Sequence, residues 1–361
     1  MHLKPIHEQA VVIMGASSGI GRDTALRFAR KGACVVAAAR SESGLQSLIN
    51  EIRLQGGRAI AATCDTTNEE QVRNVAQLCV REFGRIDTWV QLAGVSLYAR
   101  FEDTTIDEWR RVVDVNLNGQ ALGAMVALPH LKRQGGALIC VSSVESRRAL
   151  PYQAAYAASK HGVKAMCEAL RMELEHEGVP VSVTEIIPAS INTPLFEHAR
   201  TKLGVQPQGA PPIYPPETVS KAILYAAEHP VRELPIGAAA SALIAGENLS
   251  PAMMDRLLET FAFEKQLTDR PKPPTVDNLF APMEGMDRVK GNLKESRPFS
   301  VYTWMITHPG FVGALAMAAA GTAAIMTRGA GREVPGRERE IRPVGGHAMS
   351  HLERRRSIAR V

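Results

Sequence analysis

Cysteine is scarce in this 361-residue sequence, with five copies and no Cys-x-x-Cys pair. Such a distribution argues against a disulfide framework and favours reduced thiols in a cytosolic compartment. Two of the five, Cys34 and Cys140, fall inside apolar runs, as small buried residues do. The histidines are also isolated. His130 and His161 have no other metal-ligating residues near them, so we expect no metal site.

The sequence also lacks a secretory signal and an evenly spread excess of charge. Its first ten residues, MHLKPIHEQA, contain no apolar core, so we expect no signal peptide and a cytoplasmic location. The net charge is +5, but residues 328–361 alone hold nine Arg and four Glu, which is 9 − 4 = +5. The rest of the chain is therefore neutral overall, which argues against nucleic acid as the main partner.

The sequence does contain a regular alternation of apolar runs and amphipathic stretches. Short runs such as 33–39 and 137–141 are typical of buried parallel strands, and the segments between them have helical patterns. This alternation predicts an α/β fold, a Rossmann-like doubly wound parallel sheet with helices on both faces. Strands are expected at 11–14, 33–39, 58–63, 86–91, 137–141, 181–187 and 232–236, and helices at 22–31, 42–55, 69–83, 105–134 and 250–263.

The first apolar run leads into a glycine-rich turn, VVIMGASSGIG, over 11–21. Gly15, Gly19 and Gly21 let the backbone turn tightly and approach a pyrophosphate, whose charge the N-terminus of the following helix stabilises. The spacing is G-x-x-x-G-x-G rather than the G-x-G-x-x-G of other dinucleotide-binding turns. The turn therefore predicts a bound dinucleotide.

A tyrosine and a lysine stand four residues apart, Tyr156 and Lys160, in YAASK. Residues at this spacing share a helix face, so the lysine cation would favour the phenolate and lower the pKa of the tyrosine from about 10. Ser143 follows the apolar run 137–141, which places its hydroxyl at the carboxyl end of a strand. Together these residues indicate proton transfer to or from a carbonyl oxygen.

In order and spacing, these motifs resemble those of the short-chain dehydrogenase/reductase family. The resemblance covers about residues 10–237 and depends on GASSGIG, Asn116 within DVNLNG, Ser143 and the Tyr156/Lys160 pair. It implies hydride transfer between a nicotinamide cofactor and a small-molecule carbonyl/alcohol pair, with Asn116, Ser143, Tyr156 and Lys160 as catalytic residues. It also implies cofactor contacts from Gly15, Ser17, Ser18, Gly19, Ile20, Gly21, Asp65, Ala93, Gly94, Tyr156, Lys160, Ile191 and Thr193.

The resemblance also assigns roles and shows departures. Asn116 would carry a water to the catalytic lysine, and Asp65 would contact the adenine. The family usually has a hydrogen-bonding Thr and Asn where this sequence has Met14 and Leu92. Losing both polar partners together costs little, so we expect an apolar contact between Met14 and Leu92 instead.

The end of the second expected strand indicates which cofactor is bound. An acidic residue there would hold the ribose 2′-hydroxyl of NAD(H). This sequence has Ala39 and Arg40 instead, and an arginine can pair with a 2′-phosphate while no carboxylate repels it. The sequence therefore predicts NADP(H), against the alternative that Arg40 is a solvated surface residue.

The segment 195–218 is rich in proline and has no periodic pattern, as functional loops often do. Its position resembles that of a lid over the substrate. Its apolar residues favour a lipophilic substrate if they face the pocket, but they would say nothing of the substrate if they pack against the body of the protein. They are Leu195, Phe196, Leu203, Ile213 and Tyr214.

Four parts are expected along the chain. Residues 1–250 form the NADP-binding catalytic domain, and 251–300 form a helix followed by an extended linker. An apolar segment at 301–328 precedes a basic, disordered tail at 329–361. Within it, 309–327 has nineteen residues without charge, but seven are Ala and three are Gly. This stretch suits either a membrane surface or a packed helix in a homo-oligomer.

These observations predict an NADP(H)-dependent oxidoreductase that interconverts a carbonyl and an alcohol, with Tyr156 as acid and base. The alternative is a non-catalytic NADP-binding protein that uses the same fold for partner interaction. A single membrane span would separate the catalytic domain from the arginine-rich flank, although each would prefer the cytoplasmic side. The membrane alternatives are therefore a segment that lies in the membrane interface or a span that ignores the charge bias.

Overall fold

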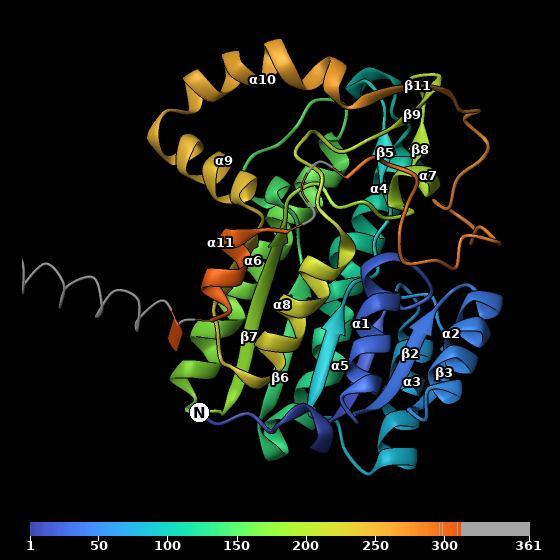
Figure 1. Ribbon diagram of the computed structural model, residues 1–361, viewed down its shortest axis with the longest axis vertical. Coiled ribbons are helices and arrows are strands. Elements are labelled where there is room, and N and C mark those ends of the chain that lie inside the picture. The colour runs from blue at the N-terminus through green and yellow to red at the C-terminus, as the bar shows by residue number, and fades with distance from the viewer. Residues whose placement is uncertain (296, 298, 309, 312–361) are drawn as a thin grey trace, which may run out of the picture. The chain divides into compact units, whose positions relative to one another are not determined.

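A parallel sheet of seven strands forms the centre of the computed structural model (Figure 1). Its strands follow the order β10-β7-β6-β4-β1-β2-β3, and every neighbouring pair is parallel. This arrangement confirms the predicted doubly wound α/β fold. The strands are β1 (Ala10–Met14), β2 (Cys34–Ala39), β3 (Arg58–Thr63), β4 (Thr88–Gln91), β6 (Gly136–Val141), β7 (Val181–Pro188) and β10 (Glu233–Ile236).

The structure describes residues 1–295, 297, 299–308 and 310–311. Residues 1–309 form one compact unit, and the predictions for 309–327 and for the tail at 329–361 fall outside the described residues, apart from 310–311. No helix within the described part of the chain is long and apolar enough to cross a membrane. The same residues contain no cluster of His, Cys, Asp and Glu that could hold a metal ion.

Helices cover both faces of the sheet (Figure 1). Successive strand residues point to opposite faces, so Val11 and Ile13 belong to one buried cluster while Val12 and Met14 belong to the other. The first cluster is completed by α1 (Gly19–Arg30), α2 (Glu42–Leu54) and α8 (Pro216–Glu228). The second is completed by α3 (Glu69–Phe83), α5 (Gly119–Gln134) and α6 (Ala154–His176).

The long helix predicted over 105–134 changes its winding in the middle. α4 (Ile106–Val113) begins at a capping box formed by Thr105 and Glu108. A π-helical turn, η3 (Asp114–Asn118), joins it to α5 without a break. Asn116 lies in that turn, and such single π-helical turns inside a helix are frequent at functional sites. The turn directs the side-chain amide of Asn116 toward Val95, in the loop that follows β4.

The loop predicted over 195–218 has more structure than its sequence indicates. It contains α7 (Leu195–His198), β8 (Arg200–Thr201) and β9 (Val205–Pro207). β8 pairs with β5 (Leu97–Tyr98), so the segment is fastened to the loop after β4. From its proline-rich end, α8 begins with Pro216 in the first turn, where a missing N–H costs nothing.

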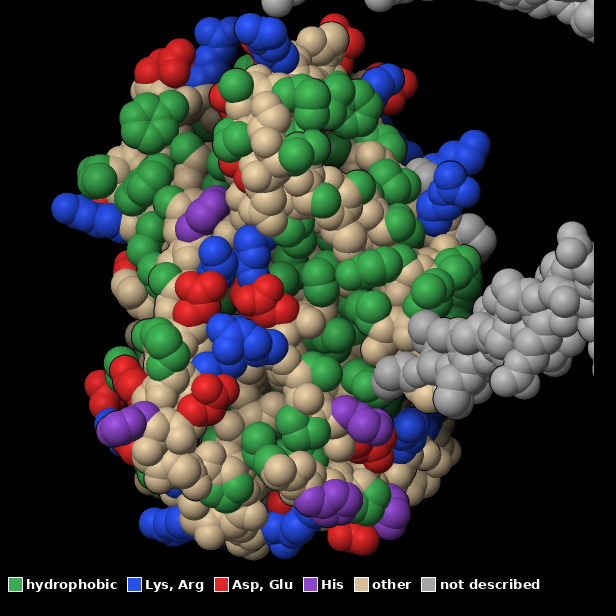
Figure 2. Space-filling model, turned by 90° about the vertical axis from the view of Figure 1, so that its left-hand side faces the viewer, with side chains coloured by type: hydrophobic (Ala, Val, Ile, Leu, Met, Phe, Trp, Pro, Cys, Tyr) green, Lys and Arg blue, Asp and Glu red, His purple; other side chains and the backbone are tan. Residues whose placement is uncertain are grey.

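Two further helices follow the sheet. α9 (Ala238–Leu249) was not predicted, whereas α10 (Pro251–Lys265) agrees with the helix predicted over 250–263, and the Ser250 side chain caps it by accepting a hydrogen bond from the Met253 amide. Figure 2 views the molecule from their side and shows apolar side chains over its upper part. Leu249 is 81% exposed there and Leu257 is 56% exposed.

The segment predicted as an extended linker is instead packed onto the catalytic unit. β11 (Leu267–Pro271) pairs antiparallel with β9. Residues 272–293, here called the strap, then cross the ends of α1, α2 and α7 (Figure 1). Strap residues contact each of these helices: Arg288 O accepts from the Gly19 amide, Glu284 binds Ser43, and Asn278 N donates to His198 O. The final described helix of this unit is α11 (Val301–Ile306).

Candidate active site

The glycine-rich turn between β1 and α1 can be built only from glycines at two points. Gly15 has φ of +90°, and a Cβ on it would lie 2.6 Å from the Ala93 nitrogen. A Cβ on Gly21 would lie 2.1 Å from the Gly15 oxygen. The absence of side chains therefore lets the turn pack against the end of β4, and α1 begins at Gly19 with its first amides at the edge of the sheet.

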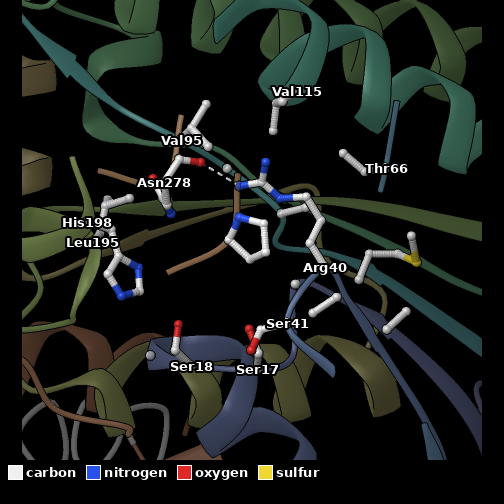
Figure 3. Close-up of a pocket in the computed structure, with 18 of the residues that line it drawn as sticks. Ser17, Ser18, Arg40, Ser41, Thr66, Val95, Val115, Leu195, His198 and Asn278 are labelled. Atoms are coloured by element: carbon white, nitrogen blue, oxygen red, sulfur yellow. Dashed lines mark hydrogen bonds between the residues drawn. The ribbon is translucent and has the colours of Figure 1, made fainter. Parts of the chain in front are cut away.

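A cavity of about 190 Å³ opens beside this turn, at the carboxyl ends of β1, β2 and β4 (Figure 3). We call it the turn cavity. Of the predicted cofactor residues, Gly21, Tyr156, Lys160 and Ile191 do not line it, because Gly21 packs behind the turn and the other three line a second cavity. The predicted residues that do line it are Gly15, Ser17, Ser18, Gly19, Ile20, Arg40, Asp65, Ala93, Gly94 and Thr193.

Arg40 extends from the end of β2 into the turn cavity (Figure 3). Its Nη2 donates a 2.6 Å hydrogen bond to the backbone oxygen of Asn278 in the strap. Its Nη1 is buried and has no hydrogen-bond partner among the described residues. Burial and the nearby Arg111 guanidinium lower the pKa of Arg40. Arg40 is therefore not a solvated surface residue but a partly unpaired cation inside the cavity.

Asp65 lines the same cavity, but its carboxylate is already held by other protein groups. Oδ2 lies 2.7 Å from Arg111 Nη2, and Oδ1 accepts hydrogen bonds from the Thr67 amide and hydroxyl. Burial acts to raise the pKa of Asp65, but the bonds from Arg111 and Thr67 outweigh it and the pKa is lowered. Asp65 is thus an ionised wall residue fixed by Arg111.

The strap supplies residues that the sequence motifs did not indicate. Asn278, Pro282 and Met283 line the turn cavity together with His198 of α7. The oxygen Oδ1 of Asn278 and the Nε2 of His198 are buried without hydrogen-bond partners in the described structure. Burial and the cations around it lower the pKa of His198 to about 4, so the imidazole is neutral. No motif in the sequence indicates these positions. Asn278, Pro282 and Met283 lie in the segment predicted as an extended linker, and His198 lies in the non-periodic segment 195–218.

Ser143, Tyr156 and Lys160 line a second cavity of about 140 Å³, which we call the tyrosine cavity. Ser143 follows β6, and the other two lie one turn apart on α6. Ile20, Thr193 and Leu195 line both cavities, so the two adjoin at these residues. Ile191, predicted as a cofactor contact, also lines the tyrosine cavity.

Burial controls the ionisation of Tyr156 and Lys160. Desolvation raises the pKa of Tyr156, the nearby Glu145 raises it further, and a hydrogen bond with Ser143 lowers it in part. The pKa of Lys160 is lowered to about 8, again mainly by burial. The lysine Nζ lies 5.5 Å from the tyrosine ring centroid and donates to Val141 O at 3.1 Å. The lysine was predicted to lower the pKa of Tyr156, but burial has the larger effect and the pKa of Tyr156 is raised.

Asn116 is fixed between the loop after β4 and α6. Its Nδ2 donates to Val95 O at 2.9 Å and to Ser159 Oγ at 3.3 Å, and its Oδ1 accepts from the Val95 amide at 2.8 Å. The side chain is fully buried. Asn116 therefore links Val95, which lines the turn cavity, to Ser159, which precedes Lys160 on α6.

The predicted side-chain contact between Met14 and Leu92 is wrong. Leu92 N donates to Met14 O at 2.9 Å, so the two residues meet through their backbones. The Met14 side chain packs in the cluster on one face of the sheet and Leu92 packs against the cluster on the other. Successive side chains alternate between the two faces of the sheet, so Met14 and Leu92 lie on opposite faces. Both are apolar, so neither lacks a hydrogen-bond partner.

The lid segment and α10 close the tyrosine cavity. Leu195 and Phe196 line it, whereas Leu203, Ile213 and Tyr214 do not and pack against the body of the unit. Gln266, at the end of α10, also lines the cavity and is 1% exposed. It accepts a 2.8 Å hydrogen bond from the Gln153 side chain. The wall of this cavity is therefore more polar than the lid sequence alone indicates.

Comparison with known proteins identifies the family. Residues 9–204 match the family described as short chain dehydrogenase. The uncharacterized oxidoreductase YxnA of Bacillus subtilis is 41% identical over 313 residues, which covers 86% of this chain and 88% of YxnA. A 3beta-hydroxysteroid dehydrogenase of Eggerthella lenta is 36% identical over 190 residues, 52% of this chain and 72% of that protein.

Solved structures are similar as well. The alcohol dehydrogenase of the archaeon Thermococcus sibiricus complexed with 5-hydroxy-NADP is 26% identical, with a TM-score of 0.55 over 63% of this chain and 94% of that one. A short-chain type dehydrogenase/reductase from Mycobacterium marinum is 30% identical, with a TM-score of 0.55 over 63% and 92%. With the fold and the family match over more than half of its residues, the chain belongs to the short-chain dehydrogenase family of oxidoreductases.

Proposed function

We propose that this protein is an NADP(H)-dependent oxidoreductase that interconverts a carbonyl and an alcohol, with Tyr156 as the acid and base. The observation that carries the proposal is the junction of the two cavities. Ser143, Tyr156 and Lys160 face a space that meets the turn cavity at Ile20 and Thr193. A substrate oxygen beside the tyrosine hydroxyl would then lie next to the reactive end of a dinucleotide in the turn cavity.

The residues of the turn cavity fit NADP(H). The close packing of Gly15 and Gly21 leaves a backbone surface that a pyrophosphate can approach. Arg40 has a buried Nη1 without a partner, which suits a 2′-phosphate, and no carboxylate ends β2. When bound, this cofactor supplies or accepts the hydride. The protein binds it through Ser17, Ser18, Gly19, Ile20, Arg40, Ala93, Gly94, Ile191 and Thr193.

The catalytic residues divide the proton chemistry among them. Tyr156 donates its hydroxyl proton to the carbonyl oxygen in reduction and takes it back in oxidation. Ser143, which hydrogen-bonds Tyr156, orients that oxygen. Lys160 favours the phenolate once it carries a proton, and Asn116 positions the segment before Lys160 through Ser159. None of these roles requires a metal ion.

The tyrosine cavity indicates a small, uncharged substrate with an apolar part. Leu150, Ile191, Leu195 and Phe196 form an apolar side of the wall, which keeps a lipophilic portion of the substrate in the proposal. A cavity of about 140 Å³ is close in volume to one that holds a benzene ring. The space beside Tyr156 therefore accommodates a reacting group of about that size.

Turnover of NADPH tests the proposal directly. Purified protein is given a panel of small ketones and aldehydes, and Tyr156→Phe is compared with Tyr225→Phe, the same change on α8 away from both cavities. We expect Tyr156→Phe to lower kcat by at least about a hundredfold while the Kd of NADPH, from nucleotide fluorescence, stays within about twofold. Equal turnover in the two variants would refute the role of Tyr156. Tight NADPH binding with no turnover by the wild type would favour the non-catalytic alternative.

A further inference from the structure

The tyrosine cavity contains a buried carboxyl group that the proposed chemistry does not use. Glu145 lies two residues after Ser143, in the short helix η4 (Val144–Ser146). It lines the cavity and is only 5% exposed. Its Oε2 has no hydrogen-bond partner among the described residues. An unpaired carboxyl oxygen in a buried wall is costly to a protein unless a ligand pairs with it.

Glu145 also lies close to the reacting groups. Its backbone amide donates to Ser143 Oγ at 3.1 Å, which ties the position of its segment to the proposed substrate-orienting hydroxyl. Its carboxyl raises the pKa of both Tyr156 and Tyr98, so it is near the two phenols that line the same cavity. A ligand group that reaches Glu145 is therefore only a short distance from the carbon whose oxygen faces Tyr156.

The carboxyl is protonated at neutral pH. Burial raises the pKa of Glu145 to about 8, although the Leu150 amide, Lys160 and Gln153 each act to lower it. A neutral carboxyl group offers one O–H donor and an acceptor oxygen. The Leu150 amide and the Gln153 side chain already donate to this carboxyl, so the unpaired Oε2 offers its O–H to a ligand oxygen, and a hydroxyl group can accept it.

The remaining wall favours the same kind of ligand. Lys160 is the single basic residue among the described lining residues, and its Nζ is held by Val141 O. An anionic substrate would therefore have only this one cation to pair with, and the proposed chemistry assigns that cation to Tyr156. Apart from Lys160 and Glu145, the polar side chains of the wall carry neutral hydroxyl and amide groups, among them Ser96, Tyr98, Gln153, Ser190 and Gln266.

We propose that Glu145 is a specificity-determining residue and that the substrate carries a hydroxyl group on the carbon next to the reacting carbon. The substrate class is then the small hydroxyketones and hydroxyaldehydes and the corresponding diols. This inference rests on the proposed function, since it names the substrate of the same cavity. A substrate with a methyl or methylene in place of the hydroxyl leaves the carboxyl unpaired and is rejected.

Isosteric substrate pairs test the proposal. Hydroxyacetone is compared with butanone, and acetoin with methyl isopropyl ketone, because each pair exchanges a hydroxyl for a methyl group. We expect kcat/KM of the wild type to favour the hydroxylated member by about tenfold or more. Glu145→Leu should bring this ratio of kcat/KM values close to one, whatever its effect on the turnover of either ketone. Glu145→Gln should keep the preference, because an amide also donates and accepts.

Two results would overturn the inference while leaving the proposed function intact. One is a wild-type ratio close to one, and the other is an unchanged ratio in Glu145→Leu when both proteins turn over butanone. A binding measurement covers the case without turnover. With NADP⁺ present, propylene glycol should raise the Tm of the wild type more than sec-butanol does, and Glu145→Leu should lose the difference. Equal shifts in both proteins would refute the hydroxyl contact independently of catalysis.

Discussion

At the scale of single residues, burial rather than charge pairing sets the titration of the tyrosine cavity. Desolvation is the largest cause of the raised pKa of Tyr156 and Glu145 and of the lowered pKa of Lys160. The spacing of Tyr156 and Lys160 correctly indicated neighbours on one helix, but their titration depends on how deeply α6 is packed. Burial depth is a property of the whole fold, so a four-residue motif could not predict the direction of the shift.

The raised pKa of Glu145 makes stability depend on pH. The folded state keeps its proton up to about pH 8, whereas an unfolded glutamate loses it above about 4.5. The folded state therefore binds more protons over this window, and the free energy of unfolding falls as pH rises through it. Glu145→Gln removes this term, so its Tm relative to the wild type should rise steadily from pH 5 to pH 8. Over this pH range, the free energy of unfolding of Glu145→Gln relative to that of the wild type should rise by a total on the order of 4 kcal/mol.

Calorimetry or a thermal melt at several pH values measures this difference. Glu259→Gln serves as the control, because Glu259 is exposed on α10 and its replacement should give a difference that does not change with pH. A Glu145→Gln difference that is flat between pH 5 and pH 8 would show that the carboxyl is ionised in the folded protein.

Arg40 should decide between the two nicotinamide cofactors. Its unpaired Nη1 faces a cavity in which a 2′-phosphate would accept a charge-assisted hydrogen bond. Arg40→Ala should raise the Kd of NADPH by roughly 10- to 100-fold and change the Kd of NADH by less than about threefold. Fluorescence titration of both cofactors checks this, with the exposed Arg110→Ala as the control. An equal loss for NADPH and NADH would mean that Arg40 only supports the shape of the cavity.

At the scale of elements, periodic segments were predictable and segments held by distant contacts were not. The predicted seven strands agree with the sheet, because their apolar runs reflect burial on both faces. α9 was missed because its small and apolar residues lack a helical period, and α8 because its start merges with a proline-rich stretch. The strap is held by scattered hydrogen bonds and an ion pair to α1, α2 and α7, which leave no pattern in its own sequence.

The strap covers the turn cavity, so cofactor release should depend on how tightly it is seated. Gly291 N donates to Asn192 O at 3.2 Å, and a Cβ on Gly291 would lie 2.4 Å from the backbone oxygen of Thr193. Thr193 belongs to the loop after β7 and lines both cavities. Gly291→Ala must therefore move the strap away from that loop. We expect the dissociation rate of NADPH to increase by about tenfold, equal to about 1.4 kcal/mol.

A stopped-flow chase of bound NADPH with excess NADP⁺ measures that rate. Lys294→Ala, a change at an exposed residue just beyond the strap, should leave it unaltered. A slower or unchanged rate in Gly291→Ala would show that the strap does not limit release.

At the scale of the whole molecule, the candidate site is assembled from residues far apart in the chain. The motifs within residues 10–237 predicted the turn, the serine and the tyrosine–lysine pair. They did not predict that Gln266 would close one cavity, or that Asn278 would bind Arg40 in the other. Both come from the part of the chain that lacks motifs. Such contacts follow from three-dimensional packing, and no local spacing encodes them.

This assembly predicts where the chain can be shortened. Every described residue that lines the two cavities lies within the unit 1–309, and the strap that covers one of them does too. Residues 328–361 contribute the entire net charge, so a chain ending at 309 has a net charge of 5 − 5 = 0. We expect this shortened chain to retain kcat/KM within about twofold, since it keeps every described residue that lines the cavities. Its solubility should fall, because a net charge near zero favours association. A steady-state assay beside light scattering measures both, and a large loss of kcat/KM in a monomeric sample would mean that residues 310–361 take part in the site.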